Sequence, residues 1–329
     1  MHIVRAVSAF PEPAAVAPEA RAAILAWYAE RGRPLAFRRT RDPYAVLVSE
    51  AMAQQTQAAR AAEAWQRFMA RFPTVEVLAA AQLSDVVRQW AGLGYDRRAL
   101  ALWQAARMIV GEHGGQVPAD VRALQALPGV GPYTARAVAA LAFGLPVGAV
   151  DVNVRRVLGR ITAGDAAALR GPEMQAVADA SVPPDDPGGW THALMDIGAT
   201  VCKPRNQRCG DCPARPWCRY DSAGPSARYA PAAPPARYAS TSPPADPAPR
   251  PEARPRGTRE RQAPFASTNR WLRGRIMTRL RATPDGAWAI FDGPLGAHDA
   301  AAIEVALDGL ERDGLIELDT GGRARLRVS

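Results

Sequence analysis

A stretch near the middle of the chain reads Leu127-Pro128-Gly129-Val130-Gly131-Pro132-Tyr133-Thr134-Ala135. Helical periodicity ends near Leu127 and starts again at Pro132, so the two glycines lie between two helices. Glycines two residues apart allow a tight hairpin, because glycine adopts backbone conformations that other residues avoid. The outward N–H groups of such a hairpin, together with the positive end of the next helix, can bind an anion. A G-x-G turn alone is a weak signal, because a helix that ends at glycine before another helix looks the same.

The sequence around this hairpin predicts an all-α fold. Helical periodicity with short breaks extends from about residue 18 to residue 224, and no alternating run demands a sheet. Residues 225–265 are instead rich in Pro, Ala, Ser and Arg, a composition that cannot bury enough apolar surface to offset the entropy of ordering. We interpret residues 225–265 as a linker and residues 1–17 as a flexible N-terminus.

Residues 266–329 predict a small α+β module. One helix has an apolar face formed by Leu272, Ile276 and Leu280, and a second, capped by Asp299 and ended by Gly314, carries Ile303, Ala306, Leu307 and Leu310. Two strands around the turn at 319–322 then predict a basic hairpin. This order indicates a winged-helix-like module, although any small α+β domain with a basic face fits it too. We expect phosphate contacts from its exposed arginines: Arg273, Arg275, Arg279, Arg323, Arg325 and Arg327.

The charge of the whole chain points to a polyanionic partner. The 329 residues carry a formal net charge of +9, which favours nucleic acid, although basicity alone is weak evidence. The chain contains no apolar run of membrane-spanning length, so we expect no membrane partner.

All four cysteines of the chain lie in one short segment, at Cys202, Cys209, Cys212 and Cys218. A structural zinc site more usually has two close pairs, and here only Cys209 and Cys212 form one. A cubane iron–sulfur cluster needs four thiolates from one compact loop, which this segment can supply. The spacing favours the cluster over zinc and leaves two disulfides as a third alternative. The first residues lack the apolar core of a secretory signal, which argues against an oxidising compartment.

Taken together, these motifs resemble the helix-hairpin-helix DNA glycosylases that carry a four-iron cluster, and among them the adenine glycosylases of the MutY type. The resemblance covers roughly residues 20 to 222. Besides the glycine hairpin and the cysteines, it rests on Ser49-Glu50-Ala51-Met52-Ala53-Gln54-Gln55-Thr56-Gln57, Gly92-Leu93-Gly94-Tyr95 and Val150-Asp151-Val152-Asn153-Val154-Arg155-Arg156.

The resemblance implies a domain organisation and a set of partners. A six-helix barrel with the hairpin would span residues 38–141, and a cluster domain would combine residues 18–37 with 142–224, with the active site in the cleft between them. The implied cofactors are a [4Fe–4S] cluster on the four cysteines and a monovalent cation at the hairpin. We expect a monomer that binds double-stranded DNA with a mispaired adenine, in the cytoplasm at the nucleoid.

Two carboxylates are the candidate catalytic groups. Releasing adenine from an oxocarbenium-like sugar needs an acid for the base and an anion for the cation. Glu50 is predicted to share a helical face with Gln54 and Gln57, which could be a solvated face, but the resemblance implies that it protonates adenine and assists water. Its pKa must then be raised, chiefly by burial. Asp151 looks like an ordinary helix N-cap, and the resemblance implies that its charge stabilises the sugar cation.

Two further residues are implied to orient Asp151, namely Tyr133 and Asn153. Relatives that also cleave the strand use a lysine at the position of Tyr133 to form a Schiff base. The only lysine of this chain is Lys203, within the cysteine segment. We therefore predict a monofunctional glycosylase without lyase activity.

Recognition of the lesion is assigned by resemblance to Arg38, Gln55, Thr56, Tyr95, Gly129 and Gly131. Tyr95 would wedge into the base stack, and Gln55 and Thr56 would face the base opposite adenine, 8-oxoguanine or guanine. The chain departs from the family in having Leu35-Ala36-Phe37-Arg38 before the catalytic helix and no Nudix-like C-terminal domain, as in the shortened actinobacterial enzymes. Alternatives are a glycosylase for thymine or hypoxanthine and a non-catalytic iron–sulfur regulator that binds DNA.

Overall fold

The computed structural model describes residues 15–222 and 264–329. The predicted linker lies outside the described residues except for its last two positions, and so do residues 1–14 of the predicted N-terminus. The α-helices before the linker are α1 (Pro18–Arg31), α2 (Pro43–Ala53), α3 (Ala58–Arg71), α4 (Val75–Ala80), α5 (Leu83–Gln89), α6 (Arg97–His113), α7 (Val121–Ala126), α8 (Pro132–Phe143), α9 (Val152–Ala163), α10 (Gly171–Ser181), α11 (Pro187–Thr200) and α12 (Arg219–Ser222).

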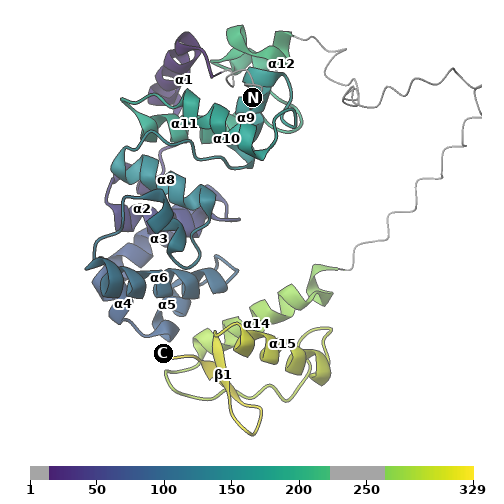
Figure 1. Cartoon of the computed structure of the whole chain (residues 1–329). Helices are drawn as coiled ribbons and strands as arrows, with labels where there is room; N and C mark the ends of the chain where they lie inside the picture. Colours follow the sequence, from purple (N-terminus) through teal and green to yellow (C-terminus); the bar gives the residue numbers. More distant parts are fainter. Residues whose placement is uncertain (1–14, 223–263) are drawn as a thin grey trace, which may run out of the picture.

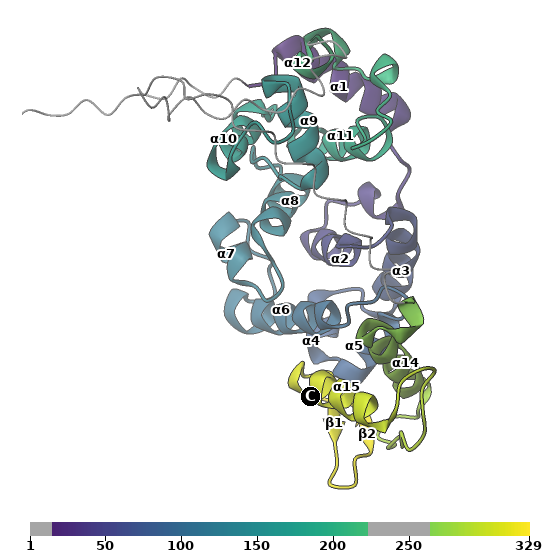
Figure 2. The ribbon, with the colours of Figure 1, turned by 90° about the vertical axis from the view of Figure 1, so that its right-hand side faces the viewer.

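Short 3-10 helices occur at Ala36–Arg39, Cys209–Asp211, Arg215–Trp217 and Phe265–Ser267. After the linker come α14 (Asn269–Ala282), α15 (Ala300–Arg312), β1 (Ile316–Leu318) and β2 (Ala324–Leu326). The molecule is elongated, with α1 and α9–α12 at one end, α2–α8 in the middle and the C-terminal elements at the other end (Figure 1). The same order is visible after a quarter turn (Figure 2). None of the described helices is long and apolar enough to cross a bilayer.

Local signals set the starts of the three helices that matter for the site. Helices α2 and α8 each begin with a proline, which costs no hydrogen bond at the first helical position. The Asp42 side chain accepts a hydrogen bond from Ala45 N and caps α2, and Asp151 caps α9. The helix–hairpin–helix predicted around Gly129 is present as α7, a turn and α8.

The end of α2 differs from the prediction. The helix stops at Ala53, and Gln55 has a backbone φ of 53°, so the chain turns before Gln54 and Gln57 could continue the face that carries Glu50. Gln57 instead precedes α3 as its N-cap. The predicted polar face of Glu50, Gln54 and Gln57 on one helix is therefore wrong.

Two hydrophobic cores hold the described residues together. The first is formed by residues of α2–α8 and also of α14, α15 and the β-hairpin. The second joins α1 to α9–α11 and to the cysteine segment, and Val16 N donates a hydrogen bond to Ser181 Oγ at 3.0 Å across this core. Both cores thus contain segments that are far apart in the sequence.

The C-terminal module, residues 264–329, has the predicted helices and hairpin. Leu272, Ile276 and Leu280 are buried on α14, and β1 pairs antiparallel with β2 so that Ile316 faces Leu326. Three of its six predicted phosphate ligands form ion pairs within the module, namely Arg273 with Asp313, Arg323 with Asp319 and Arg325 with Glu317. Their charges are therefore largely committed to the fold.

The module docks onto α5 and α6. Arg88 of α5 donates hydrogen bonds to the carbonyls of Arg281 (3.3 Å) and Thr283 (3.0 Å), and Arg281 forms an ion pair with Asp96. Leu83 N donates to Val328 O at 3.0 Å. Because the module shares one hydrophobic core with α2–α8, it is integrated into the central part of the protein and is more than a basic appendage.

Candidate active site

Glu50 is a buried acid on the last turns of α2. Only 7% of its surface is exposed, and the residues before it on the helix, from Tyr44 to Ser49, are all buried. Burial raises the pKa of Glu50 to about 7, a hydrogen bond from Tyr133 opposes this rise, and the charge of Asp151 adds to it. The side chain can therefore hold or release a proton near neutral pH.

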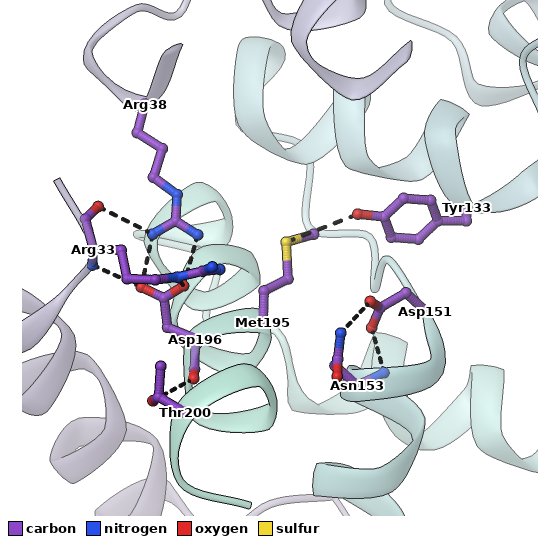
Figure 3. Close-up of polar contacts among 8 residues, drawn as sticks. All are labelled: Arg33, Arg38, Tyr133, Asp151, Asn153, Met195, Asp196 and Thr200. Atoms are coloured by element: carbon purple, nitrogen blue, oxygen red, sulfur yellow. Dashed lines mark hydrogen bonds and ion pairs between the residues drawn. The ribbon is translucent and has the colours of Figure 1, made fainter. Parts of the chain in front are cut away.

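Tyr133 stands in the first turn of α8, next to the glycine hairpin. Burial raises its pKa well above the ordinary value, and the charge of Glu50 adds to the effect. Its hydroxyl also lies 3.8 Å from Met195 Sδ on α11 (Figure 3). Tyr133 is thus a neutral hydroxyl donor that connects α2, α8 and α11.

Asp151 is held rigidly at the start of α9. Its Oδ1 accepts hydrogen bonds from Asn153 N (2.8 Å) and Val154 N (2.7 Å), and its Oδ2 accepts one from Asn153 Nδ2 (2.9 Å) (Figure 3). Asn153 is fixed in turn by Arg156, which donates to Asn153 Oδ1 at 2.8 Å. The four predicted catalytic residues thus meet where the two cores adjoin, with Glu50 and Tyr133 from one side and Asp151 and Asn153 from the other.

A buried ion-pair network that the sequence did not reveal lies beside these residues. Asp196 of α11 has no exposed surface, and it accepts hydrogen bonds from Arg33 Nε (2.6 Å) and from both terminal nitrogens of Arg38 (2.7 and 2.8 Å) (Figure 3). Burial alone would raise the pKa of Asp196, but the two arginines lower it. Arg38, predicted to contact DNA or the lesion, is therefore engaged with Asp196, and only 7% of its side chain is exposed.

Arg38 of this network also lines a pocket of about 240 Å³, together with Tyr28, Ser49 and His192. Burial, reinforced by the charge of Arg38, lowers the pKa of His192 to about 3, so His192 is neutral at physiological pH. Asp196 has one sequence signal: it is a lone charge in the apolar run Leu194-Met195-Asp196-Ile197, and a charge in such a run needs a partner. The identity of that partner has no sequence signal.

Of the residues predicted to read the lesion, Gln55, Thr56 and Tyr95 lie on two loops. Gln55 is exposed in the turn after α2, and Thr56 is half-buried beside it. Tyr95 is 44% exposed and has a φ of 51°, which is unusual for a residue other than glycine. At the glycine hairpin, Gly129 has a φ of 76°, and a Cβ there would lie 2.7 Å from Ala101 Cβ, whereas Gly131 is the N-cap of α8.

Arg98 fixes both loops and was also missed. This half-buried residue of α6 donates hydrogen bonds to backbone carbonyls of the α2 terminus and of the Gly92–Tyr95 loop, which are those of Ala51 (2.9 Å), Met52 (3.2 Å), Gln54, Leu93 (3.1 Å) and Gly94 (2.9 Å). The carbonyls at the end of α2 have no helical partner and need such a donor. Arg98 therefore sets the distance between the two loops.

The four cysteines line one pocket, together with apolar residues of α9 and α11. No disulfide joins any of them. Among the described residues, no group of three or more His, Cys, Asp or Glu side chains is arranged to hold a metal ion. Arg160 donates a hydrogen bond to Cys202 Sγ at 3.3 Å.

Comparison with known proteins identifies the family to which the chain belongs. The model of the family described as "HhH-GPD superfamily base excision DNA repair protein" matches residues 48–178. Adenine DNA glycosylase of Mycolicibacterium smegmatis is 37% identical over 306 residues, which span 92% of this chain and 94% of that protein. Human adenine DNA glycosylase is 42% identical over 211 residues, 60% of this chain and 39% of the human protein.

A solved structure shows the same fold. The structure of a thermostable thymine-DNA glycosylase superposes with a TM-score of 0.58 at 30% identity, and the match covers 61% of this chain and 95% of that one. The resemblance inferred from the motifs is thereby confirmed at the level of the family.

Proposed function

The chain belongs to the adenine DNA glycosylases of the HhH-GPD superfamily, and from this premise we propose that, acting as a monomer, it releases adenine mispaired with 8-oxoguanine or guanine and leaves the strand uncut. The observation that carries the proposal is the burial of Glu50, with a pKa raised to about 7, in hydrogen-bond contact with Tyr133 and close to Asp151. A perturbed acid paired with a second carboxylate is what N-glycosidic cleavage requires.

Glu50 is the general acid of this scheme. At pH 7 an ordinary glutamate is protonated in about one molecule in 500, whereas a group with a pKa of about 7 is protonated in about half. The proton moves to the adenine ring as the bond to the sugar breaks, and the resulting carboxylate can accept a proton from the attacking water. Tyr133 stabilises this carboxylate because its hydroxyl donates to it.

Asp151 is the electrostatic partner of the sugar cation. Its hydrogen bonds to Asn153 and to the first N–H groups of α9 fix its position before substrate binds. A charge that is already oriented stabilises the developing cation without reorganisation during the reaction. Asn153 acts here by positioning Asp151.

The absence of a suitable amine supports release of the base without strand cleavage. The one lysine of the sequence, Lys203, is exposed in the cysteine segment directly after Cys202, and its carbonyl accepts a hydrogen bond from Arg160 (2.9 Å). Tyr133 has no amine with which to form a Schiff base. Water is therefore the nucleophile that completes the reaction.

Cys202, Cys209, Cys212 and Cys218 would hold a [4Fe–4S] cluster. Such a cluster, when bound, cross-links the loop and supplies a redox-active centre. The loop between Cys202 and Cys209 carries Lys203, Arg205 and Arg208, so its fixed shape would present positive charge to a phosphate. We assign the cluster a structural role.

The deciding experiment is a single-turnover cleavage assay on duplexes with A:8-oxoG, A:G, T:G and hypoxanthine pairs, each developed with and without hot alkali. Alkali-dependent cleavage at adenine supports the proposal. Release of thymine alone would instead favour a mismatch glycosylase for another base, a reading encouraged by the thymine-DNA glycosylase of the same fold. Cleavage without alkali would contradict the monofunctional mechanism.

A further inference from the structure

A cleft that the proposed chemistry does not use opens between α6 and the C-terminal module. Its volume is about 900 Å³, within the range of clefts that take small ligands or single nucleotides. The part of the protein before the linker contributes Gln55, Gly94 and Tyr95, and the module contributes Asn269, Arg270 and others. Aromatic, amide and guanidinium groups thus face one space, a combination suited to nucleic acid.

Tyr95 stands at this cleft in a constrained backbone conformation. Its φ of 51° costs free energy for a residue with a Cβ, and such conformations persist only where the surroundings impose them. Arg98 imposes this conformation, because it donates hydrogen bonds to the carbonyls of Leu93 and Gly94, the two residues before Tyr95. Tyr95 as a whole remains 44% exposed, so the backbone is fixed and the side chain is not buried in a core.

What orients the ring is a residue of the module. The guanidinium carbon of Arg270 lies 4.6 Å from the centroid of the Tyr95 ring, closer than that of Arg98 at 5.7 Å. Arg270 belongs to the first turn of α14. The other end of this helix is anchored to α5 and to the start of α6 by the Arg281–Asp96 ion pair and by the hydrogen bonds of Arg88. The helix therefore presents Arg270 from a fixed position.

We propose that Arg270 is a positioning residue for Tyr95: its guanidinium holds the ring at the edge of the cleft, in the orientation from which the ring enters the DNA base stack. The C-terminal module is thereby part of the apparatus that extrudes the target base. This inference rests on the proposed function, since it needs Tyr95 to be the wedge. The planar cation stacks on the ring and reduces the rotamer freedom that the wedge would otherwise lose on insertion.

The test compares Arg270→Ala and Arg270→Lys in the full-length protein with Arg312→Ala. Arg312 is exposed at the end of α15 and does not line the cleft, so this control removes one positive charge from the same module. Base extrusion is followed by the fluorescence of 2-aminopurine placed next to the target adenine, and adenine release by single-turnover assay. Thermal unfolding of each variant checks the fold.

Arg270→Ala is expected to slow extrusion about 2- to 30-fold, the range that corresponds to one cation–π contact. Lysine should restore little, because it lacks the planar stacking surface, and Arg312→Ala should match the wild type. In a Tyr95→Ala background, Arg270→Ala should have no further effect on extrusion, because the two residues act as one unit.

Three results would overturn the inference: Arg270→Ala behaving like Arg312→Ala, Arg270→Ala extruding the base faster, or an equal loss in the Tyr95→Ala background. The second would mean that Arg270 restrains the wedge, and the third that it acts directly on DNA. Failure of the proposed function is distinguishable, because it would appear as absence of adenine release by the wild type while the extrusion signal still reports on Arg270.

Discussion

Replacing Glu50 with glutamine should stabilise the protein at alkaline pH while it removes the catalytic proton. Glutamine has the shape of a protonated glutamate and cannot ionise. Below pH 4.5, the ordinary pKa, the wild-type side chain is protonated in both the folded and the unfolded chain, so the two proteins should be similarly stable. Above this pH the unfolded chain releases the proton while the buried side chain retains it.

The magnitude follows from the two pKa values. Between pH 4.5 and about 7, the folded-state value, the wild type loses stability as pH rises, because its unfolded state binds fewer protons than its folded state. Above pH 7 both states are ionised and the loss levels off. Since each pKa unit corresponds to about 1.4 kcal/mol, Glu50→Gln should be more stable by about 1 kcal/mol at pH 5 and about 3 kcal/mol at pH 8.

Urea unfolding at pH 5 and pH 8, at constant ionic strength, measures these differences. Glu63→Gln is the matched control, because Glu63 is an exposed glutamate on the neighbouring helix α3. The control should differ from the wild type by less than about 0.5 kcal/mol at both pH values. If Glu50→Gln were no more stable than the control at pH 8, burial would not be perturbing Glu50, and the basis for its role as an acid would be lost.

Four other outcomes are expected. Asp151→Asn should slow single-turnover release by at least about 100-fold yet bind DNA normally, since asparagine still caps α9; a rate within tenfold of wild type would contradict the role of the charge. Wild-type release should fall with rising pH above about 7 as Glu50 deprotonates, and a profile that stays flat to pH 9 would assign the proton to another group. Iron analysis should give about four atoms per chain, and Cys209→Ser should lose iron, colour and DNA affinity; stoichiometric zinc in anaerobically prepared protein would refute the cluster. Deleting residues 264–329 should lower the unfolding free energy by several kcal/mol, because it uncovers the shared core, whereas unchanged urea unfolding would show that the docked module adds no stability.

Local sequence signals predicted much of the fold. Proline and aspartate marked the starts of α8 and α9, and glycine marked the hairpin, because each acts within a few residues of its own position. The apolar face of α14 was also visible. The surface that this face contacts was not visible, because an apolar stripe shows only that it must be covered. In the structure α14 packs against α5, which precedes the linker in the sequence.

The errors and omissions at the site have a common cause in distant contacts. The end of α2 was missed because no glycine or proline marks residues 54–57; the helix ends where Arg98, 44 residues after Gln54, binds its last carbonyls. The ion pairs of Asp196 join residues 158 and 163 positions apart, and composition cannot indicate such pairing. Glu50 and Asp151 were proposed from motifs, whereas their mutual proximity had to come from the fold.

The interleaving of the two cores sets an order for synthesis of the chain on the ribosome. Helix α1 is made first, yet it packs on α9–α11 and must wait for them, whereas α2–α8 are contiguous and can begin to fold as they emerge. Their surface for α14 then stays uncovered while the cysteine segment and the linker are translated. A nascent chain that stalls in this interval would expose the apolar surface that α14 later covers, and exposed apolar surface is what chaperones bind.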